Sequence, residues 1–522
     1  MKSNGYTINT YWLLVASILL LSYGLRVSGL TSESLWIDEG YSLALATHSI
    51  KEIVQGTAAD QHPPLYYMLL HFWLLQNQSV FFLRYFSVLI GVLGVAGAIL
   101  FGCSLLNRKI GLLTGFFLAC SPMHIWYSQE ARMYILLSVE VTFSVYSLWR
   151  LINSSSRFYF YIYLLSTLGA LYTHYFAGFV IIFENLIVLC WALKSKRNFL
   201  GKWASIQGMI FIAFAPWLPI ALYQALYHQM KWIPPLTIET VLSTLVLMVY
   251  GDSYRQIPSL AFIIGEVLFI VGIIQGLWRA LNNKKQHFPF LFVGLWFTLP
   301  LSTIAVISQK YPIFQPKQML FLVLPLLMLI AGALVELPMV QRWITLGVMS
   351  VFIIISLANF YTLNTKHEWR EAAIYIERSC QPGDLLYFNP AAGALVFKVY
   401  FKGLFPIDGY PPGYDVVKGG WEGNSVTPEI AHKVMSSFSA QYKRVWLIEF
   451  NPHFWDPGGF LATWLGQHGQ LIVDQQFRGI RVRLYDFKLE FRQRLPNLTR
   501  GQVGDFSVTQ SYLNGLCGGF CR

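Results

Sequence analysis

The sequence predicts an α-helical polytopic membrane protein of about eleven transmembrane helices, followed by a C-terminal extracytoplasmic α/β domain. Hydrophobic residues make up 55% of the 522 residues and charged residues only 12%, whereas soluble domains carry about 25% charged residues. Apolar segments recur that approach the roughly 20 residues a helix needs to cross a bilayer. From about residue 363, alternating strand and helix patterns replace these segments.

The length of each apolar segment indicates whether it can cross the bilayer as a helix. A candidate at residues 63–75 has only 13 residues. At about 1.5 Å per residue it reaches roughly 20 Å, short of the ~30 Å hydrocarbon core. We predict that it lies at the outer membrane surface. The eleven predicted spans are residues 11–30, 84–106, 110–127, 131–150, 158–173, 176–193, 203–223, 259–280, 288–308, 318–337 and 342–361.

The distribution of basic residues supports this topology. With eleven spans, most basic residues between spans share one side with the N-terminus, as the positive-inside tendency requires. The opposite, outer side then receives the loop after the first span, residues 123–132, 224–258 and 309–317, and everything after residue 362. The inner group comprises Lys2, Arg108, Lys109, Arg150, Arg157, Lys194, Lys196, Arg197, Lys202, Arg279, Lys284, Lys285 and Arg342.

Composition excludes several function classes. The net charge of +12 comes from short basic clusters rather than one basic stripe, so it does not indicate nucleic-acid binding. The six cysteines contain no CxxC pair and no zinc-ligand spacing. The candidate functional residues face away from cytoplasmic nucleotides, and the sequence has no glycine-rich phosphate loop. A nucleotide-sugar enzyme or an ATPase is therefore disfavoured.

The patterns after residue 362 divide the chain into three parts. A membrane domain covers residues 1–362, an α/β domain residues 363–488 and a loose tail residues 489–522. The interleaving of strands and helices is typical of a small α/β domain. Helices are expected at residues 368–379 and 391–400, and strands at 384–388, 444–449 and 480–487.

An acidic loop follows the first span. Only 12 Asp or Glu residues occur before residue 363, and two of them, Asp38 and Glu39, stand together just after Trp36. Such a carboxylate can act as a general base or bind a divalent cation; alternatively, the acids only keep a solvated loop out of the lipid. Ser49 and Glu52 form a capping-box pattern, which predicts a short helix whose apolar face lies on the membrane.

Other polar residues are expected at the outer ends of spans. Glu130 either makes a favourable helix-dipole contact or serves as a second acid on the face of Asp38. His62 precedes two prolines that suit a helix start, and it either contributes to a site or lies in a rigid turn. His174 ends the fifth span, where a histidine often only packs. The outer-face cations either anchor lipid headgroups or converge on a lipid-linked phosphate: Arg84, Arg132, Lys231, Arg255 and Lys317.

Together these stretches resemble the GT-C glycosyltransferases of the protein-mannosyltransferase and aminoarabinose-transferase kind (glycosyltransferase family 39 type). The resemblance covers residues 8–362 in order and spacing. One departure is Lys317-Gln318, where many relatives carry Arg-Tyr, and lysine lacks the bidentate fork of arginine. The residues that carry the resemblance are 36–42, 62–67, 84–87, 121–122, 127–134 and 173–175, with 366–373 resembling the start of the external domain.

The resemblance implies an inverting transfer of one sugar from a polyprenyl-phosphate donor to an acceptor hydroxyl outside a bacterial plasma membrane. The acceptor would be a lipid, a glycan or a protein. Asp38 would be the base, and Glu39 and Glu130 would orient groups or bind a cation. A divalent cation (Mg²⁺, Mn²⁺ or Zn²⁺) stays open. Arg84, Arg132 and Lys317 would bind the phosphate, and His62, Tyr66 and His174 the substrate.

Two alternatives stay open: a lipid-linked oligosaccharide ligase, and a flippase or transporter of lipid-linked glycans. Transporters usually place charged residues near the bilayer midplane. Only Glu140, Glu184 and Glu266 are acids well inside predicted spans, and the motifs lie at span ends. This distribution favours an enzyme.

Overall fold

The computed structural model describes residues 4–154, 156–195, 198–227, 233–251, 259–283, 286–363, 365–419 and 425–487. The chain divides into two compact units. The first combines Met1–Leu30 with Asp60–Asn364, and the second combines Thr31–Ala59 with Thr365–Arg522. The loop after the first helix therefore belongs to the same unit as the C-terminal part of the chain. The predicted tail, residues 489–522, lies outside the described residues.

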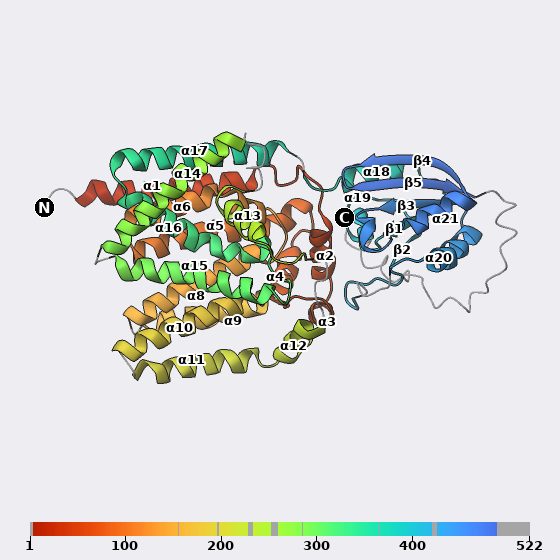
Figure 1. The fold of residues 1–522 in the computed structure, drawn as a ribbon. Helices are drawn as coiled ribbons and strands as arrows, with labels where there is room; N and C mark the ends of the chain where they lie inside the picture. The colour runs from red at the N-terminus through yellow and green to blue at the C-terminus, as the bar shows by residue number, and fades with distance from the viewer. Residues whose placement is uncertain are drawn as a thin grey trace. The chain divides into compact units, whose positions relative to one another are not determined.

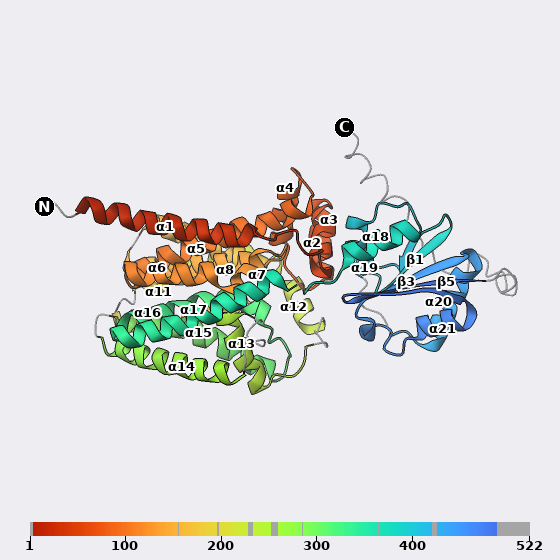
Figure 2. The ribbon, with the colours of Figure 1, turned by 90° about the horizontal axis from the view of Figure 1, so that it is seen from above.

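The first unit is helical, and its long helices run side by side in Figures 1 and 2. Its helices are α1 (Asn4–Val27), α4 (Leu65–Leu74), α5 (Val80–Leu105), α6 (Arg108–Cys120), α7 (Pro122–Ser128), α8 (Tyr134–Asn153), α9 (Arg157–Thr173), α10 (Ala177–Ser195), α11 (Asn198–Phe214), α12 (Leu218–Tyr227), α13 (Ile238–Tyr250), α14 (Ser259–Asn282), α15 (His287–Ser308), the 3₁₀ helix η2 (Pro316–Leu322), α16 (Val323–Glu336) and α17 (Met339–Thr362).

The described helices make the protein an integral, multi-pass membrane protein. Seven apolar helical segments are long enough to cross a bilayer, and two bent pairs would raise the number to nine within the described residues. The bent pairs are α6 with α7 (61°) and α11 with α12 (73°). Two further predicted spans form the shorter helices α9 and α10, so the count of eleven stays a prediction. The segment predicted to be too short to span forms α4, which has 10 residues.

Helix starts and close helix packing follow from particular residues. The Ser79 side chain accepts a hydrogen bond from the backbone N–H of Phe82, which caps α5, and Asn107 caps α6 in the same way. A Cβ on Gly102 would lie 2.7 Å from the Cα of Gly111. Glycine is therefore what allows α5 and α6 to approach so closely, as small residues do between membrane helices.

The second unit contains a five-stranded mixed sheet in the order β2-β1-β3-β5-β4. Strand β1 pairs in parallel with β2 and β3, whereas β5 pairs antiparallel with β3 and β4. The elements are α2 (Ile37–Ala46), α3 (Ile50–Ala59), α18 (Trp369–Ser379), β1 (Asp384–Asn389), α19 (Gly393–Tyr400), β2 (Ile407–Gly409), α20 (Pro428–Gln441), β3 (Arg444–Glu449), η3 (Pro452–Phe454), α21 (Phe460–His468), β4 (Gln470–Phe477) and β5 (Ile480–Asp486).

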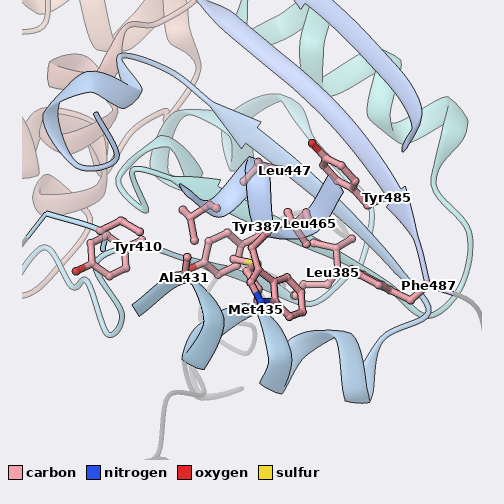
Figure 3. Close-up of a cluster of buried hydrophobic side chains, with 13 residues drawn as sticks. Leu385, Tyr387, Tyr410, Ala431, Met435, Leu447, Leu465, Tyr485 and Phe487 are labelled. Carbon is pink, nitrogen blue, oxygen red and sulfur yellow. The ribbon is translucent and has the colours of Figure 1, made fainter. Parts of the chain in front are cut away.

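Helices cover both faces of this sheet. On one face, Tyr387 of β1 and Leu447 of β3 belong to a buried cluster that includes Met435 of α20 (Figure 3). The next residue of β1, Phe388, points the other way because successive strand residues alternate. Its ring lies 5.1 Å from that of Phe397 of α19. The unit is thus an α/β/α sandwich, which confirms the predicted α/β fold.

One local expectation was wrong. The Ser49–Glu52 capping box forms, since the Ser49 backbone N–H donates to the Glu52 carboxylate over 3.0 Å. However, Ile53 is fully buried within the protein, and a Cβ on Gly56 would lie 2.8 Å from the carbonyl oxygen of Val416. The inner face of α3 therefore packs on protein rather than on the membrane.

Candidate active site

The two neighbouring acids of the second unit have different environments. They fall in the first turn of α2, where the helix dipole favours negative charge. Glu39 is fully buried, and its Oε2 lies 3.1 Å from the Nζ of Lys366. The same oxygen accepts a hydrogen bond from the backbone N–H of Trp36 over 3.4 Å. Asp38 is half-buried, so of the two carboxylates it is the one with access to solvent.

The first unit brings together five polar residues from four separate segments. Ring contacts join them: the His62 and His174 ring centroids are 5.5 Å apart, and the His174 and Tyr134 centroids are 6.0 Å apart. The Nζ of Lys317 lies 5.8 Å from the centroid of the Tyr134 ring. We call this group the imidazole–cation cluster: His62 ahead of α4, Arg132 and Tyr134 at the start of α8, His174 after α9, and Lys317 in η2.

The pKa values of the two imidazoles of the cluster are both lowered. Burial lowers the pKa of His174 to about 3, and the positive charges of Arg132 and Lys317 lower it further. Burial also lowers the pKa of His62 well below its ordinary value, and the nearby Arg132, His174 and Lys317 lower it further. The charged side chains that act on both imidazoles are therefore cations. Such a local positive potential suits an anionic ligand.

The hydrogen bonding of His174 identifies its tautomer. Its Nδ1 accepts a hydrogen bond from the backbone N–H of Phe176 over 3.1 Å, so in the neutral ring the proton lies on Nε2. Among the described residues, this buried Nε2 has no hydrogen-bond partner. A buried N–H donor within the electrostatic influence of two cations is therefore available to a ligand.

The remaining predicted residues have mainly protein contacts. An Arg132 Nη1 donates to the Tyr67 hydroxyl over 3.1 Å, and the Trp126 indole donates to a Glu130 carboxylate oxygen. An Arg84 Nη1 donates to the carbonyl oxygen of Leu30 over 2.8 Å.

Tyr66, a predicted substrate-binding residue, is fully buried against aromatic rings. Its ring centroid lies 5.6 Å from that of Tyr67 and 6.0 Å from that of Phe86. This packing holds α4 against α5. The predicted outer-face cations Lys231 and Arg255 lie outside the described residues.

Sequence reasoning missed Arg26, which is fully buried at the end of α1. Its guanidinium donates to the carbonyl oxygens of Ala119 (3.0 Å) and Leu118 (3.1 Å) and lies 2.6 Å from the Nδ1 of His124. In return, the Gln129 amide donates to the Arg26 carbonyl oxygen over 3.0 Å. Arg26 thus fixes the corner between α6 and α7, and Gln129 holds the end of α7, immediately before Glu130, against the end of α1. The sequence feature that could have indicated Arg26 is a basic residue at the outer end of the first span.

The divalent cation that the resemblance leaves open stays a prediction. Within the described ranges, no group of three or more His, Cys, Asp and Glu side chains is arranged to hold a metal ion. Asp38 belongs to the second unit and Glu130 to the first.

With its helical membrane unit and its α/β sandwich, the chain has the fold of the GT-C glycosyltransferases. The solved structures with this fold include ArnT from Cupriavidus metallidurans in the apo state, with a TM-score of 0.61 and 13% identity over 92% of this chain and 98% of that chain. ArnT bound to undecaprenyl phosphate gives a TM-score of 0.59 at 12% identity, with 92% and 98% of the two chains covered.

The archaeal oligosaccharyltransferase AglB from Archaeoglobus fulgidus, in complex with an inhibitory peptide and a dolichol-phosphate, is more distant. Its TM-score is 0.52 at 10% identity, over 90% of this chain and 73% of that chain. No protein-family model and no curated protein matches the sequence. The comparisons confirm the GT-C fold that the sequence motifs indicated.

Proposed function

We propose that this protein transfers a glycosyl group from a polyprenyl-phosphate donor to an acceptor hydroxyl on the outer side of the membrane. The observation that carries the proposal is the imidazole–cation cluster, a buried positive site in the helical unit of a GT-C fold. ArnT and AglB have this fold, and their structures contain undecaprenyl phosphate and a dolichol-phosphate, respectively. The polyprenyl chain accounts for a site within membrane helices.

In this proposal the cluster binds the phosphate of the donor. When the bond between the sugar and the phosphate breaks, negative charge develops on the leaving phosphate. Arg132, Lys317 and the Nε2–H of His174 stabilise that charge in a site with little water, where fixed donors are most effective. Arg84 contributes a further positive charge for the same phosphate. The neutral state of His174 makes it a hydrogen-bond donor that adds no charge of its own.

Asp38 acts as the general base in the same reaction. Its carboxylate accepts the proton of the acceptor hydroxyl while the acceptor oxygen attacks the anomeric carbon. The polyprenyl phosphate leaves from the opposite face, which inverts the anomeric configuration. Glu39 orients its surroundings through Lys366, and Glu130 does so through Trp126.

The test incubates the purified protein, reconstituted in liposomes, with a panel of polyprenyl-phosphate monosaccharides and one oligosaccharide-lipid, and follows release of the lipid phosphate. Release from a monosaccharide donor, absent in Arg132→Ala, supports the proposal. Release from the oligosaccharide-lipid alone would identify a ligase instead. Movement of donors across the bilayer without any release would identify a flippase.

A further inference from the structure

The loop that contains Asp38 is bonded to the C-terminal part of the chain along its length. The backbone N–H of Lys366 donates to the Glu33 carboxylate over 2.9 Å. The backbone N–H of Arg370 donates to the Ser34 hydroxyl over 3.1 Å, and the Tyr400 hydroxyl accepts from the backbone N–H of Leu35 over 2.8 Å. Each contact joins residues more than 330 positions apart, within the second unit.

Helix α2, whose first turn contains Asp38, lies directly on α19. A Cβ on Gly40 would lie 2.5 Å from the Cγ2 of Val396 and 3.2 Å from its backbone nitrogen. Any side chain at this position would push α2 away from α19, because real Cβ atoms do not approach other atoms so closely. Glycine two residues after Asp38 therefore fixes the distance between the acid-bearing helix and the sandwich.

An ion pair fixes the rotation of the same helix. Glu39 is fully buried, and the Lys366 side chain that pairs with it is 11% exposed. A buried carboxylate that loses its partner is strongly unfavourable. Because adjacent residues on a helix point about 100° apart, holding Glu39 inward turns Asp38 outward. At the other end of the loop, Gly56 of α3 contacts the backbone of Val416.

We propose that the C-terminal sandwich carries the general base, so that α18, α19 and Lys366 set the orientation of the Asp38 carboxylate. Four residues then act as positioning residues, since they act through Asp38 and do not touch the reacting atoms: Gly40, Lys366, Val396 and Tyr400. The inference rests on the proposed function of Asp38. It gives the C-terminal domain a direct part in the chemistry.

A pair of substitutions tests the positioning role. Gly40→Ala should lower kcat about 100-fold, since small misplacements of a catalytic group can cost that much, and should leave the affinity for the donor unchanged. Val396→Ala removes the Cγ2 methyl that the new Cβ meets, so the double variant Gly40→Ala/Val396→Ala should recover at least tenfold of the loss. Gly294→Ala is the matched control, because a Cβ there has nothing within 4 Å.

The inference is overturned if the double variant is no faster than Gly40→Ala, or if Gly40→Ala weakens donor binding and leaves kcat unchanged. If Gly40→Ala does not fold, Tyr400→Phe replaces it. This variant loses one hydrogen bond to Leu35 and should also lower kcat at constant donor affinity, and an unchanged kcat would count against the proposal.

Hydrogen exchange separates this inference from the proposed function. In the full-length protein under increasing denaturant, the amides of residues 37–46 and 393–400 should lose protection in one step. Asp38→Asn should not alter that step. If residues 37–46 open independently of α19, the sandwich does not carry the loop, whatever Asp38 does. If Asp38→Asn is fully active while the step is shared, only the assignment of the base fails.

Discussion

Arg132→Ala is expected to lower kcat/KM for the donor because it removes a buried cation from the imidazole–cation cluster. Arg132 is 5% exposed, so once its side chain is removed little water reaches the site to stabilise the phosphate in its place. Two unit charges about 4 Å apart interact by about 4 kcal/mol at an effective dielectric constant of 20. Truncating one partner of a buried charge pair costs about 2–5 kcal/mol. At 1.4 kcal/mol per tenfold change, kcat/KM for the donor should fall about 30- to 4,000-fold.

Tyr67→Phe is the control for lost packing. It removes only the hydroxyl that accepts from Arg132 over 3.1 Å. Because the Arg132 guanidinium is charged, this hydrogen bond contributes about 1.5–3 kcal/mol, so Tyr67→Phe should cost about 10- to 140-fold and less than Arg132→Ala in the same assay. Lys317→Ala should resemble Arg132→Ala, and Lys317→Arg should be tolerated because it restores the commoner residue of the resembling family.

The assay measures lipid-phosphate release over a range of donor concentrations, together with competition by undecaprenyl phosphate. The reasoning is refuted if Arg132→Ala and Lys317→Ala both keep the wild-type kcat/KM and the wild-type inhibition by undecaprenyl phosphate. The phosphate would then be bound elsewhere.

Three further predictions concern stability and topology. The native pKa of His174, about 3, lies below the unfolded value of about 6.5, so between these pH values the unfolded state binds one more proton than the native state. Stability should therefore fall as pH falls through this window, by about 1.4 kcal/mol per pH unit for this group. His174→Gln should flatten the dependence of Tm on pH, and an unchanged slope would contradict the assignment. Arg26→Met should lower Tm in detergent, because it removes charged hydrogen bonds worth about 1.5–3 kcal/mol each. Arg26→Lys should restore only part of the lost Tm. A wild-type Tm in Arg26→Met would rule out the role of Arg26 at the α6–α7 corner. In a cysteine-free background, cysteines at Gln76 and Gly383 should react with impermeant reagents from outside and one at Asn283 should not; labelling of Asn283 in intact cells would overturn the eleven-span topology.

The helical unit was predictable because each apolar run carries its own signal. Strand β3 was located to the residue, since Arg444–Glu449 is an apolar run buried on both faces. Strand β4 was missed for the opposite reason: it is an edge strand whose residues are mostly exposed on both faces, so it shows no alternation. Short apolar runs mark buried strands far better than exposed edges.

The candidate site was predictable only in part. His62, Arg132, His174 and Lys317 were found because they interrupt apolar sequence at span ends. The placement of Asp38 with the C-terminal unit was not predictable, since contacts such as Lys366 with Glu33 join residues 333 positions apart and leave no local pattern. The same holds for Arg26, whose acceptors are backbone carbonyl groups that any residue supplies.

The measurement that tests the central claim most directly is single-turnover transfer from a labelled polyprenyl-phosphate sugar at saturating donor, by wild-type protein and by Asp38→Asn, each with and without chelator. Removing a positioned base typically lowers the rate about 10²- to 10⁴-fold. The account therefore predicts that Asp38→Asn binds donor normally and transfers slower by that factor, while chelator leaves the wild-type rate unchanged. Transfer by Asp38→Asn at the wild-type rate would contradict the account, and abolition by chelator with recovery on adding a divalent ion would make Asp38 a metal ligand instead.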